Sequence, residues 1–223
     1  MNPKKTTLGL IHTSATLVPI FQDLIQKKLP YVESFNIVDD SIIQDVIRRG
    51  ELTPLTARRV TSHIASAADA GADFVLATCS SIGRAVETAA TLNSVPVLRV
   101  DQPMADQAVS MGNRIGVIAT LPTTLGPTSD LVYRRASAAN KDIVLESVLC
   151  EGAFQALMSG DSKSHDQKIA DALEKLDSQV DVILLAQASM ARVVEGLPPE
   201  TIQVPVLASP PTAIDYLSQL LPV

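Results

Sequence analysis

The sequence contains no tryptophan, and its few phenylalanines and tyrosines bring the aromatic content to only 3%. Single-stranded nucleic acids stack on aromatic side chains, so a stacking surface of that kind is not expected. A basic excess is missing as well, since 18 lysines and arginines face 24 aspartates and glutamates, for a net charge of −6. Binding to a phosphate backbone usually needs a basic surface. The composition therefore argues against a nucleic-acid partner.

Cysteine is scarce too, with Cys79 and Cys150 as the two copies. Two cysteines are too few for a disulfide framework, and they form no CxxC or Cys/His cluster of the kind that holds zinc, so no metal is expected. No stretch of about 18 uncharged apolar residues is present, so no membrane-spanning helix is expected. The first residues also lack a signal-peptide core. We therefore expect a cytoplasmic protein with reduced thiols and no membrane partner.

What the sequence does contain is a regular alternation of strand and helix patterns over a chain that is 46% hydrophobic. Strands are predicted from short apolar runs at residues 7–12, 34–38, 74–77 and 95–100. Helices are predicted between and after them, at residues 17–29, 53–71 and 80–92. The run at 74–77 is continuously apolar, as in strands buried on both faces of a parallel sheet. This order predicts an α/β fold with helices covering a parallel sheet.

The second half of the chain repeats the first. In the segments 114–120 and 8–13, Gly116 matches Gly9 and Thr120 matches Thr13, both at an offset of 107. Residues 181–195 match residues 73–87 at an offset of 108, and Val-Pro-Val-Leu recurs with an offset of 109. A period near 108 is too long for a solenoid repeat and is instead the size of a domain.

The repeat predicts two pseudo-symmetric, flavodoxin-like lobes, each a parallel sheet flanked by helices. Lobe 1 is expected at residues 1–101 plus 208–223, where a final helix at 212–221 returns to it, and lobe 2 at residues 102–207. Ligands of open parallel sheets bind at the carboxyl ends of the strands. We therefore expect the active site in a cleft between the lobes.

Small polar residues follow the predicted strands. Because helix N-termini favour anions, these strand ends suit a small carboxylate-bearing ligand. The candidate binding residues are Thr13, Ser14, Thr78, Ser80, Ser81, Thr120, Thr123, Thr124, Ala188 and Ser189.

Cys79 is the most reactive residue type among them. It lies where a strand turns into a helix, and the positive end of a helix lowers the pKa of a thiol toward neutrality. A group that titrates near the working pH can remove a proton from carbon or return it. The alternative is a cysteine that fills space as a small buried hydrophobe. The polar neighbours Thr78, Ser80 and Ser81 favour the catalytic interpretation.

The Thr-Cys-Ser-Ser segment at 78–81, the Ala-Thr-x-x-Thr segment at 119–123 and the half-repeat resemble the aspartate/glutamate racemase superfamily. That superfamily includes hydantoin racemases, maleate isomerases and arylmalonate decarboxylase. The resemblance covers essentially the whole chain. It implies a two-lobed enzyme that needs no cofactor and commonly forms a homodimer. A cysteine from each lobe would flank the α-carbon of a small carboxylate, one removing a proton and the other supplying it.

The chain departs from that pattern at Gln187, which takes the place of the second cysteine. A carboxamide is not a base at neutral pH, although it can hydrogen-bond a substrate oxygen. His12, after the first strand, is the candidate second base, and a hydrogen-bonded structural histidine is the equal alternative. The catalytic candidates are thus Cys79, Gln187 and His12.

Other polar residues receive structural interpretations. His63 is expected to face solvent from mid-helix, and His165 to lie in a helix-capping loop. Arg84 and Arg192 each have a glutamate three residues later, which favours i,i+3 ion pairs over substrate binding. Cys150 is expected to be structural.

The leading functional hypothesis is a cofactor-independent isomerase, a racemase, epimerase or tautomerase that moves a proton at the α-carbon of a small carboxylate. A single-cysteine lyase, such as a decarboxylase, is the second hypothesis, because one thiol suffices to protonate one face of a carbanion. A non-catalytic protein that binds small acids is the third.

Overall fold

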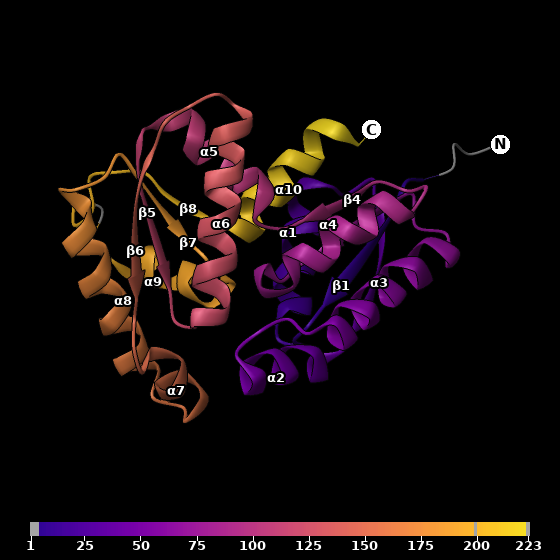
Figure 1. The fold of residues 1–223 in the computed structure, drawn as a ribbon, viewed down its shortest axis with the longest axis horizontal. Coiled ribbons are helices and arrows are strands. Elements are labelled where there is room, and N and C mark those ends of the chain that lie inside the picture. Colours follow the sequence, from indigo (N-terminus) through magenta and orange to yellow (C-terminus); the bar gives the residue numbers. More distant parts are fainter. Residues whose placement is uncertain (1–4, 199, 222–223) are drawn as a thin grey trace. The chain divides into compact units, whose positions relative to one another are not determined.

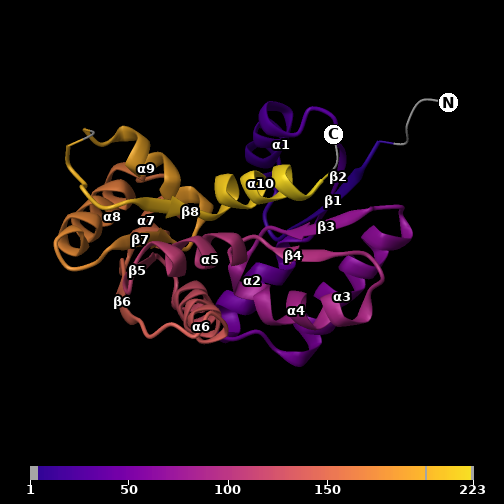
Figure 2. The ribbon, with the colours of Figure 1, turned by 90° about the horizontal axis from the view of Figure 1, so that it is seen from above.

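The computed structural model describes residues 5–198 and 200–221, and the chain divides into two compact units. Unit 1 extends to Val100 and resumes at Pro210, whereas unit 2 is the continuous segment Asp101–Ser209. Both are α/β units with a four-stranded parallel sheet (Figures 1 and 2). The predicted α/β class with two parallel sheets is therefore confirmed.

The sheet of unit 1 has the strand order β2-β1-β3-β4. Its strands are β1 (Thr7–His12), β2 (Glu33–Val38), β3 (Phe74–Ala77) and β4 (Val97–Arg99). All three neighbouring pairs are parallel, with Leu10 opposite Leu76 in the central pair. Because the strands are parallel, their carboxyl ends lie along one edge of the sheet.

Helices cover both faces of this sheet. On one face, α1 (Leu17–Lys28) and α10 (Ser209–Leu220) contribute Phe21, Ile25, Ile214 and Leu217 to a buried cluster. On the other face lie α2 (Asp40–Arg49), α3 (Pro54–Asp69), the short 3-10 helix η1 (Ser80–Ile82) and α4 (Gly83–Leu92). Helix α3 begins where the sequence predicts, because Thr53 accepts a hydrogen bond from the Thr56 amide at 3.2 Å.

The sheet of unit 2 repeats this plan in the order β6-β5-β7-β8. Its strands are β5 (Arg114–Ala119), β6 (Val144–Leu149), β7 (Val182–Leu185) and β8 (Val206–Ala208). One face is covered by α5 (Gln102–Met111) and α6 (Pro122–Ala138). The other face carries α7 (Ala153–Met158), α8 (Ser162–Asp177), η2 (Ala188–Met190) and α9 (Ala191–Gly196).

Residues that recur in both halves have the same structural role in each unit. A Cβ atom on Gly9 would lie 3.1 Å from that of Ala72, and one on Gly116 would lie 3.0 Å from Leu176 Cδ1. The two glycines thus provide the room in which the following helix and loop pack against the central strand. Asp73 accepts a hydrogen bond from the Thr7 amide at 2.9 Å, and its counterpart Asp181 accepts from the amides at the start of β5.

The last helix of each half packs in the other unit. Helix α5 follows β4 of unit 1 but packs against α6 and β7 of unit 2. Helix α10 follows β8 of unit 2 but contributes Ala213, Ile214 and Leu217 to the core of unit 1. In Figures 1 and 2, α10 lies beside α1. Unit 1 is therefore assembled from two segments that are distant in sequence.

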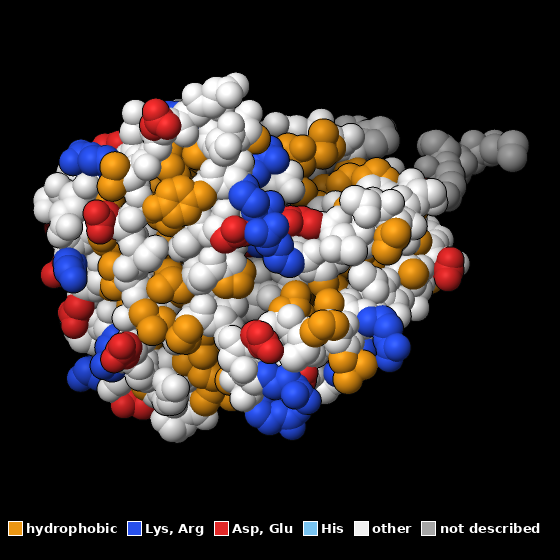
Figure 3. Space-filling model, viewed as in Figure 1, with side chains coloured by type: hydrophobic (Ala, Val, Ile, Leu, Met, Phe, Trp, Pro, Cys, Tyr) orange, Lys and Arg blue, Asp and Glu red, His pale blue; other side chains and the backbone are white. Residues whose placement is uncertain are grey.

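Three further features of the described residues concern the function classes considered above. None of their helices is both long and apolar enough to span a bilayer. Among these same residues, no three His, Cys, Asp or Glu side chains are grouped so that they could hold a metal ion. On the face drawn in Figure 3, basic and acidic side chains are interspersed with polar and apolar ones.

Candidate active site

The carboxyl ends of β1 and β3 bring the candidate residues of unit 1 together. Thr13 follows β1, and Thr78 and Cys79 follow β3, its neighbour in the sheet. Most of these side chains are buried, and Ser14 and Cys79 are partly exposed. The buried members are His12, Thr13, Thr78, Ser80 and Ser81.

Cys79 has an extended backbone and immediately precedes η1, which leads into α4. Its sulfur is approached by the hydroxyls of Thr13 and Ser81 and by the backbone amides of Ser81 and Ile82. Its side chain also packs against the apolar cluster beneath α3 and α4. The predicted position at the junction of a strand and a helix is therefore found.

The predicted acidity of this thiol is wrong. Burial raises the pKa of Cys79 above its ordinary value, and this effect outweighs the hydrogen bonds from Thr13, Ser81 and Ile82, which lower it. A thiolate that is largely withdrawn from water loses hydration energy, which the four hydrogen-bond donors do not fully replace. The thiol form is therefore favoured over the thiolate.

His12 uses both ring nitrogens within unit 1. Its Nδ1 lies 2.8 Å from Thr78 Oγ1 and its Nε2 lies 2.9 Å from Asn36 Oδ1, and the ring is tilted against Phe21. Burial lowers the pKa of His12, partly opposed by the hydrogen bond to Asn36. This geometry favours the structural alternative, in which the ring orients the Thr78 hydroxyl beside Cys79.

The equivalent strand ends of unit 2 hold Thr120 and Gln187. Gln187 Oε1 accepts hydrogen bonds from the Thr120 amide at 2.6 Å and from the Thr120 hydroxyl at 2.9 Å. Thr120 corresponds to Thr13 and Gln187 to Cys79, so each unit pairs a threonine after its first strand with the residue after its third. Within the described part of the chain, Gln187 Nε2 has no acceptor, and it remains available to donate.

The other candidates in unit 2 lie in the first turns that follow the strands. Thr123 and Thr124 belong to the first turn of α6, and Ala188 and Ser189 to η2. The buried Oγ1 of Thr123 has no hydrogen-bond partner among the described residues, whereas Ser189 is partly exposed. Hydroxyl groups thus also line the carboxyl edge of the second sheet.

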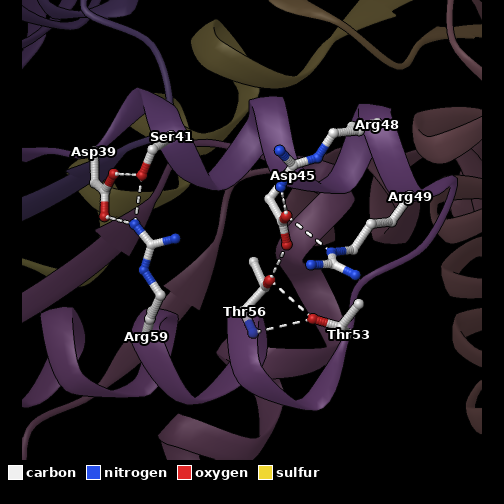
Figure 4. Close-up of polar contacts among 8 residues, drawn as sticks. All are labelled: Asp39, Ser41, Asp45, Arg48, Arg49, Thr53, Thr56 and Arg59. Carbon is white, nitrogen blue, oxygen red and sulfur yellow. Dashed lines mark hydrogen bonds and ion pairs between the residues drawn. The ribbon is translucent and has the colours of Figure 1, made fainter.

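A polar network that the sequence analysis missed joins α2 to α3 (Figure 4). Asp39, after β2, accepts hydrogen bonds from Ser41 at 2.6 Å, Arg59 at 2.7 Å and His63 at 2.8 Å. His63 was predicted to face solvent, but it is half-buried against this carboxylate. Partial burial raises the pKa of Asp39, but the three hydrogen bonds outweigh it and lower the pKa to about 2.

A second missed feature is the buried Arg99 at the end of β4. Its guanidinium donates from Nη1 to Glu87 Oε1 at 2.6 Å, and its side chain is only 1% exposed. The predicted Arg84–Glu87 pair is also present, at 3.8 Å. The sequence did contain a signal for this residue, because Arg99 is a lone arginine inside an apolar strand. The equivalent residue in the second half of the chain is Ala208.

The predictions for α8 and α9 need correction. His165 lies within α8 and is fully buried, although Asp161 does cap that helix, accepting from the Ser164 amide at 3.0 Å. Arg192 was expected to pair with Glu195, but the carboxylate at its guanidinium is Asp166, at 2.6 Å. The partner comes from a neighbouring helix, which the spacing along the sequence does not reveal.

Two other features of unit 2 lie outside the candidate site. Cys150 packs in the core beneath α8, and burial raises its pKa to about 11, as expected of a structural thiol. A cavity of about 290 Å³ lies between α5 and α6, and its cations are already paired. Arg135 binds Asp106, and Lys141 binds the carbonyl oxygens of Val109 and Gly112.

Comparison with known proteins agrees with this architecture. The sequence profile of the family described as Asp/Glu/Hydantoin racemase matches residues 8–217, nearly the whole chain. No match was found among curated protein sequences.

Solved structures of several racemases share the fold. A glutamate racemase isoform from Bacillus anthracis superimposes with a TM-score of 0.71 at 17% identity, covering 98% of this chain and 82% of its own. An allantoin racemase from Klebsiella pneumoniae gives 0.68 at 16% identity, with 96% and 87% covered. An aspartate racemase from Picrophilus torridus gives 0.68 at 14% identity, with 96% and 94% covered. At these identities the likeness establishes the fold alone.

Proposed function

Since the chain belongs to the Asp/Glu/Hydantoin racemase family, we propose that it is a cofactor-independent isomerase acting on a small carboxylate-bearing substrate. The reaction moves a proton at the α-carbon, as in a racemase, epimerase or tautomerase. The observation that carries the proposal is Cys79, which lies at the carboxyl end of β3 with two hydroxyls and two backbone amides directed at its sulfur.

Cys79 is proposed as the acid/base. Its thiolate takes the proton from the α-carbon, and the electron pair of the C–H bond moves into the neighbouring carboxylate, which becomes an enediolate. A water molecule then gives a proton to the opposite face of that carbon, the electron pair moves back, and the thiol loses its proton to the hydroxide left behind, which inverts the configuration and restores the thiolate. Because burial raises the pKa of the free thiol, the thiolate is a minor and strongly basic species, stabilised by the donors from Thr13, Ser81 and Ile82.

Gln187 is proposed as a hydrogen-bond donor to the substrate. Both bonds from Thr120 go to Oε1, which fixes the carboxamide and presents the Nε2 protons. A fixed donor at an oxygen where negative charge develops stabilises an enediolate more than the ground-state carboxylate. The proposal adds a binding role for the hydroxyls after the strands, namely Thr13, Ser14, Thr78, Ser80, Ser81, Thr120, Thr123, Thr124 and Ser189, and for the Ala188 segment.

Gln187 also favours a second candidate function, that of a decarboxylating lyase. Because Gln187 is no base, proton transfer by side chains is limited to the face reached by Cys79. In a decarboxylation, CO₂ leaves with cleavage of the carbon–carbon bond, and the electron pair stays on the α-carbon. The protonated thiol then donates its proton to that carbon. Burial favours the protonated form, which is the form that this reaction uses.

Solvent-deuterium exchange tests these proposals. The protein is incubated in D₂O with aspartate, glutamate, a hydantoin and a substituted malonate, and the label is followed by NMR and chiral chromatography. An isomerase introduces deuterium at the α-carbon of recovered substrate, whereas a lyase labels only a product that has lost CO₂. Cys79→Ser is expected to abolish either activity, and Cys150→Ser is expected to retain it.

A third outcome contradicts both proposals. If no acid exchanges label or loses CO₂, yet the acids slow alkylation of Cys79, the protein binds small acids without catalysis.

We also propose a cytoplasmic homodimer. Light scattering tests the dimer, since the chain mass is 23.7 kDa and a dimer has twice that mass.

A further inference from the structure

A fully buried arginine lies against the start of α4, the helix that follows Cys79. Arg99 is the last residue of β4 and pairs in register with Ala77, two residues before Cys79. The Arg99 side chain is 1% exposed, and it forms an ion pair with Glu87. Glu87 belongs to α4 and lies three residues after Arg84, with which it also pairs. A buried guanidinium is costly unless it is paired, so the interactions that retain it here are specific.

Gly83, the first residue of α4, provides the space that Arg99 occupies. A Cβ atom on Gly83 would lie 2.1 Å from Arg99 Cζ and 2.3 Å from its Nη2. The backbone of Gly83 is ordinary helix, with φ of −54°, so glycine is needed for room and not for conformation. The planar guanidinium therefore rests directly on the backbone of the first turn.

Unit 2 offers an internal comparison. Ala191 corresponds to Gly83 and Ala208 to Arg99, while the glutamate is kept in both halves, as Glu87 and Glu195. The unit with the arginine and the glycine carries Cys79, and the unit with two alanines carries Gln187. The fold thus forms this helix start without an arginine, and the arginine accompanies the thiol.

From this arrangement we infer that Arg99 is a positioning residue, which holds the first turn of α4 so that the amides of Ser81 and Ile82 stay directed at the Cys79 sulfur. Its consequence for catalysis rests on the proposed function, but its consequence for the thiol does not. Arg99 is buried away from solvent and contacts no substrate in this proposal.

The physical basis is the contact itself. The guanidinium fixes Gly83 relative to β4, and therefore fixes the turn between Cys79 and α4. Its positive charge is taken up by the ion pair with Glu87. The other charged or titratable side chains on the elements packed against this turn are His12 on β1, Arg58, Arg59, His63 and Asp69 on α3, and Arg84 and Glu87 on α4.

The test transplants the pair found in unit 2. In a Cys150→Ser background, the double variant Gly83→Ala/Arg99→Ala gives unit 1 the residues that unit 2 has at these positions. The added methyl group occupies part of the space left by the guanidinium, and circular dichroism checks that the fold is kept. We expect alkylation of Cys79 by iodoacetamide at neutral pH to slow about tenfold, and its pH profile to shift to higher pH.

Two further variants separate positioning from charge and from general destabilisation. Arg84→Ala removes an exposed cation from the same Glu87 carboxylate and is expected to leave the alkylation profile unchanged. Arg99→Lys keeps the charge but not the planar contact with Gly83, so it is expected to restore at most a small part of the reactivity. An alkylation profile of the double variant that superimposes on that of its parent overturns the inference.

Measuring kcat and KM of the double variant, beside its alkylation profile, separates this test from the test of the proposed function. If the parent exchanges label with a substrate, the double variant is expected to show a reduced kcat with little change in KM. If the parent exchanges no label, the proposed function fails, and a shifted alkylation profile still supports positioning of the thiol by Arg99. A loss of kcat with an unchanged alkylation profile overturns the inference even though the proposed function stands.

Discussion

At the scale of single residues, Cys79 and Gln187 occupy equivalent positions with different chemistry. Each follows the third strand of its unit, and each receives a hydrogen bond from a threonine hydroxyl after the first strand. The carboxamide is held in one orientation by two donors to one oxygen. The thiol is the only one of the two that can carry a proton between substrate and protein.

The raised pKa of Cys79 leads to a prediction about its reactivity. Because iodoacetamide reacts with thiolate, alkylation of Cys79 at neutral pH is expected to be slower than that of glutathione and to keep increasing as pH rises beyond the usual thiol range. Mass spectrometry of the Cys150→Ser protein measures the rate. Alkylation faster than that of glutathione would contradict the burial effect.

The protonation state of Cys79 that each reaction needs distinguishes the two candidate reactions by their pH dependence. An isomerase that begins with the thiolate gains kcat/KM as pH rises, whereas a lyase that uses the thiol as an acid loses kcat/KM as pH rises through the thiol pKa. A pH profile of label exchange or CO₂ release reports the sign.

The variant Gln187→Cys tests whether a base at position 187 reaches the second face of the substrate. A thiol at this position supplies an acid/base on the second face, so solvent label is expected to enter both enantiomers of a substrate about 100-fold faster, the usual scale of general acid–base catalysis. Gln187→Ser is the matched control, since it removes the carboxamide without adding a base. If the cysteine and serine variants exchange label equally, the second face is not reached from this position.

At the scale of elements, two partly buried carboxylates join α2 to α3. Asp39 joins three donors from two helices, and Asp45 accepts from Thr56 at 2.6 Å and from Arg49 at 2.9 Å (Figure 4). Helix α2 was not predicted, although its four large apolar residues have helical spacing. Ile42 and Val46 are buried in it, and its polar contacts add interactions with α3 that the sequence spacing does not reveal.

Asp39→Asn is predicted to flatten part of the acid dependence of stability. The folded pKa of Asp39 is about 2, below its ordinary value of 3.8, so its contribution is complete above the ordinary value and is lost as pH falls toward 2. The shift corresponds to about 2 kcal/mol. Urea unfolding as a function of pH measures it.

Asp23→Asn is the control for this measurement. Asp23 forms an exposed i,i+4 pair with Lys27, and such pairs contribute little. An Asp39→Asn protein with the same decrease in stability between pH 4 and pH 2 as the unchanged protein would show that the network does not stabilise the helices.

The elements themselves were largely predictable, and the reasons lie in particular residues. Gly9 and Gly116, with Asp73 and Asp181, have identical packing and hydrogen-bonding roles, so their recurrence indicated two like units. What the sequence could not reveal was burial at the strand ends, which reversed the expected pKa direction of Cys79. The sequence also did not reveal hydrogen-bond partners from other elements, such as Asp39 for His63 and Asp166 for Arg192.

At the scale of the whole molecule, unit 1 depends on its distant C-terminal helix. Ile214, Leu217 and Leu221 are buried with Leu8, Leu10 and Phe21 of the first 30 residues. Each buried side chain of this size contributes about 1.5–3 kcal/mol, and the sum is comparable to the stability of a whole domain.

Deletion of residues 209–223 is therefore predicted to unfold unit 1 and to leave unit 2 folded. Limited proteolysis with mass spectrometry is expected to cut within residues 5–100 and to spare residues 102–207. Asp215→Asn is the control, since it removes only the ion pair that α10 makes with Lys28. Protection of residues 5–100 in the truncated chain would show that α10 is dispensable.

The exchange of final helices also sets an order of events during synthesis. Domains generally fold as units, and the N-terminal one usually comes first as the chain leaves the ribosome. Here the central segment, Asp101–Ser209, is complete while the tail is still being translated. The N-terminal unit, although made first, lacks Ile214 and Leu217 until these residues have been synthesised, so its earliest residues are the last of the two units to reach their native packing.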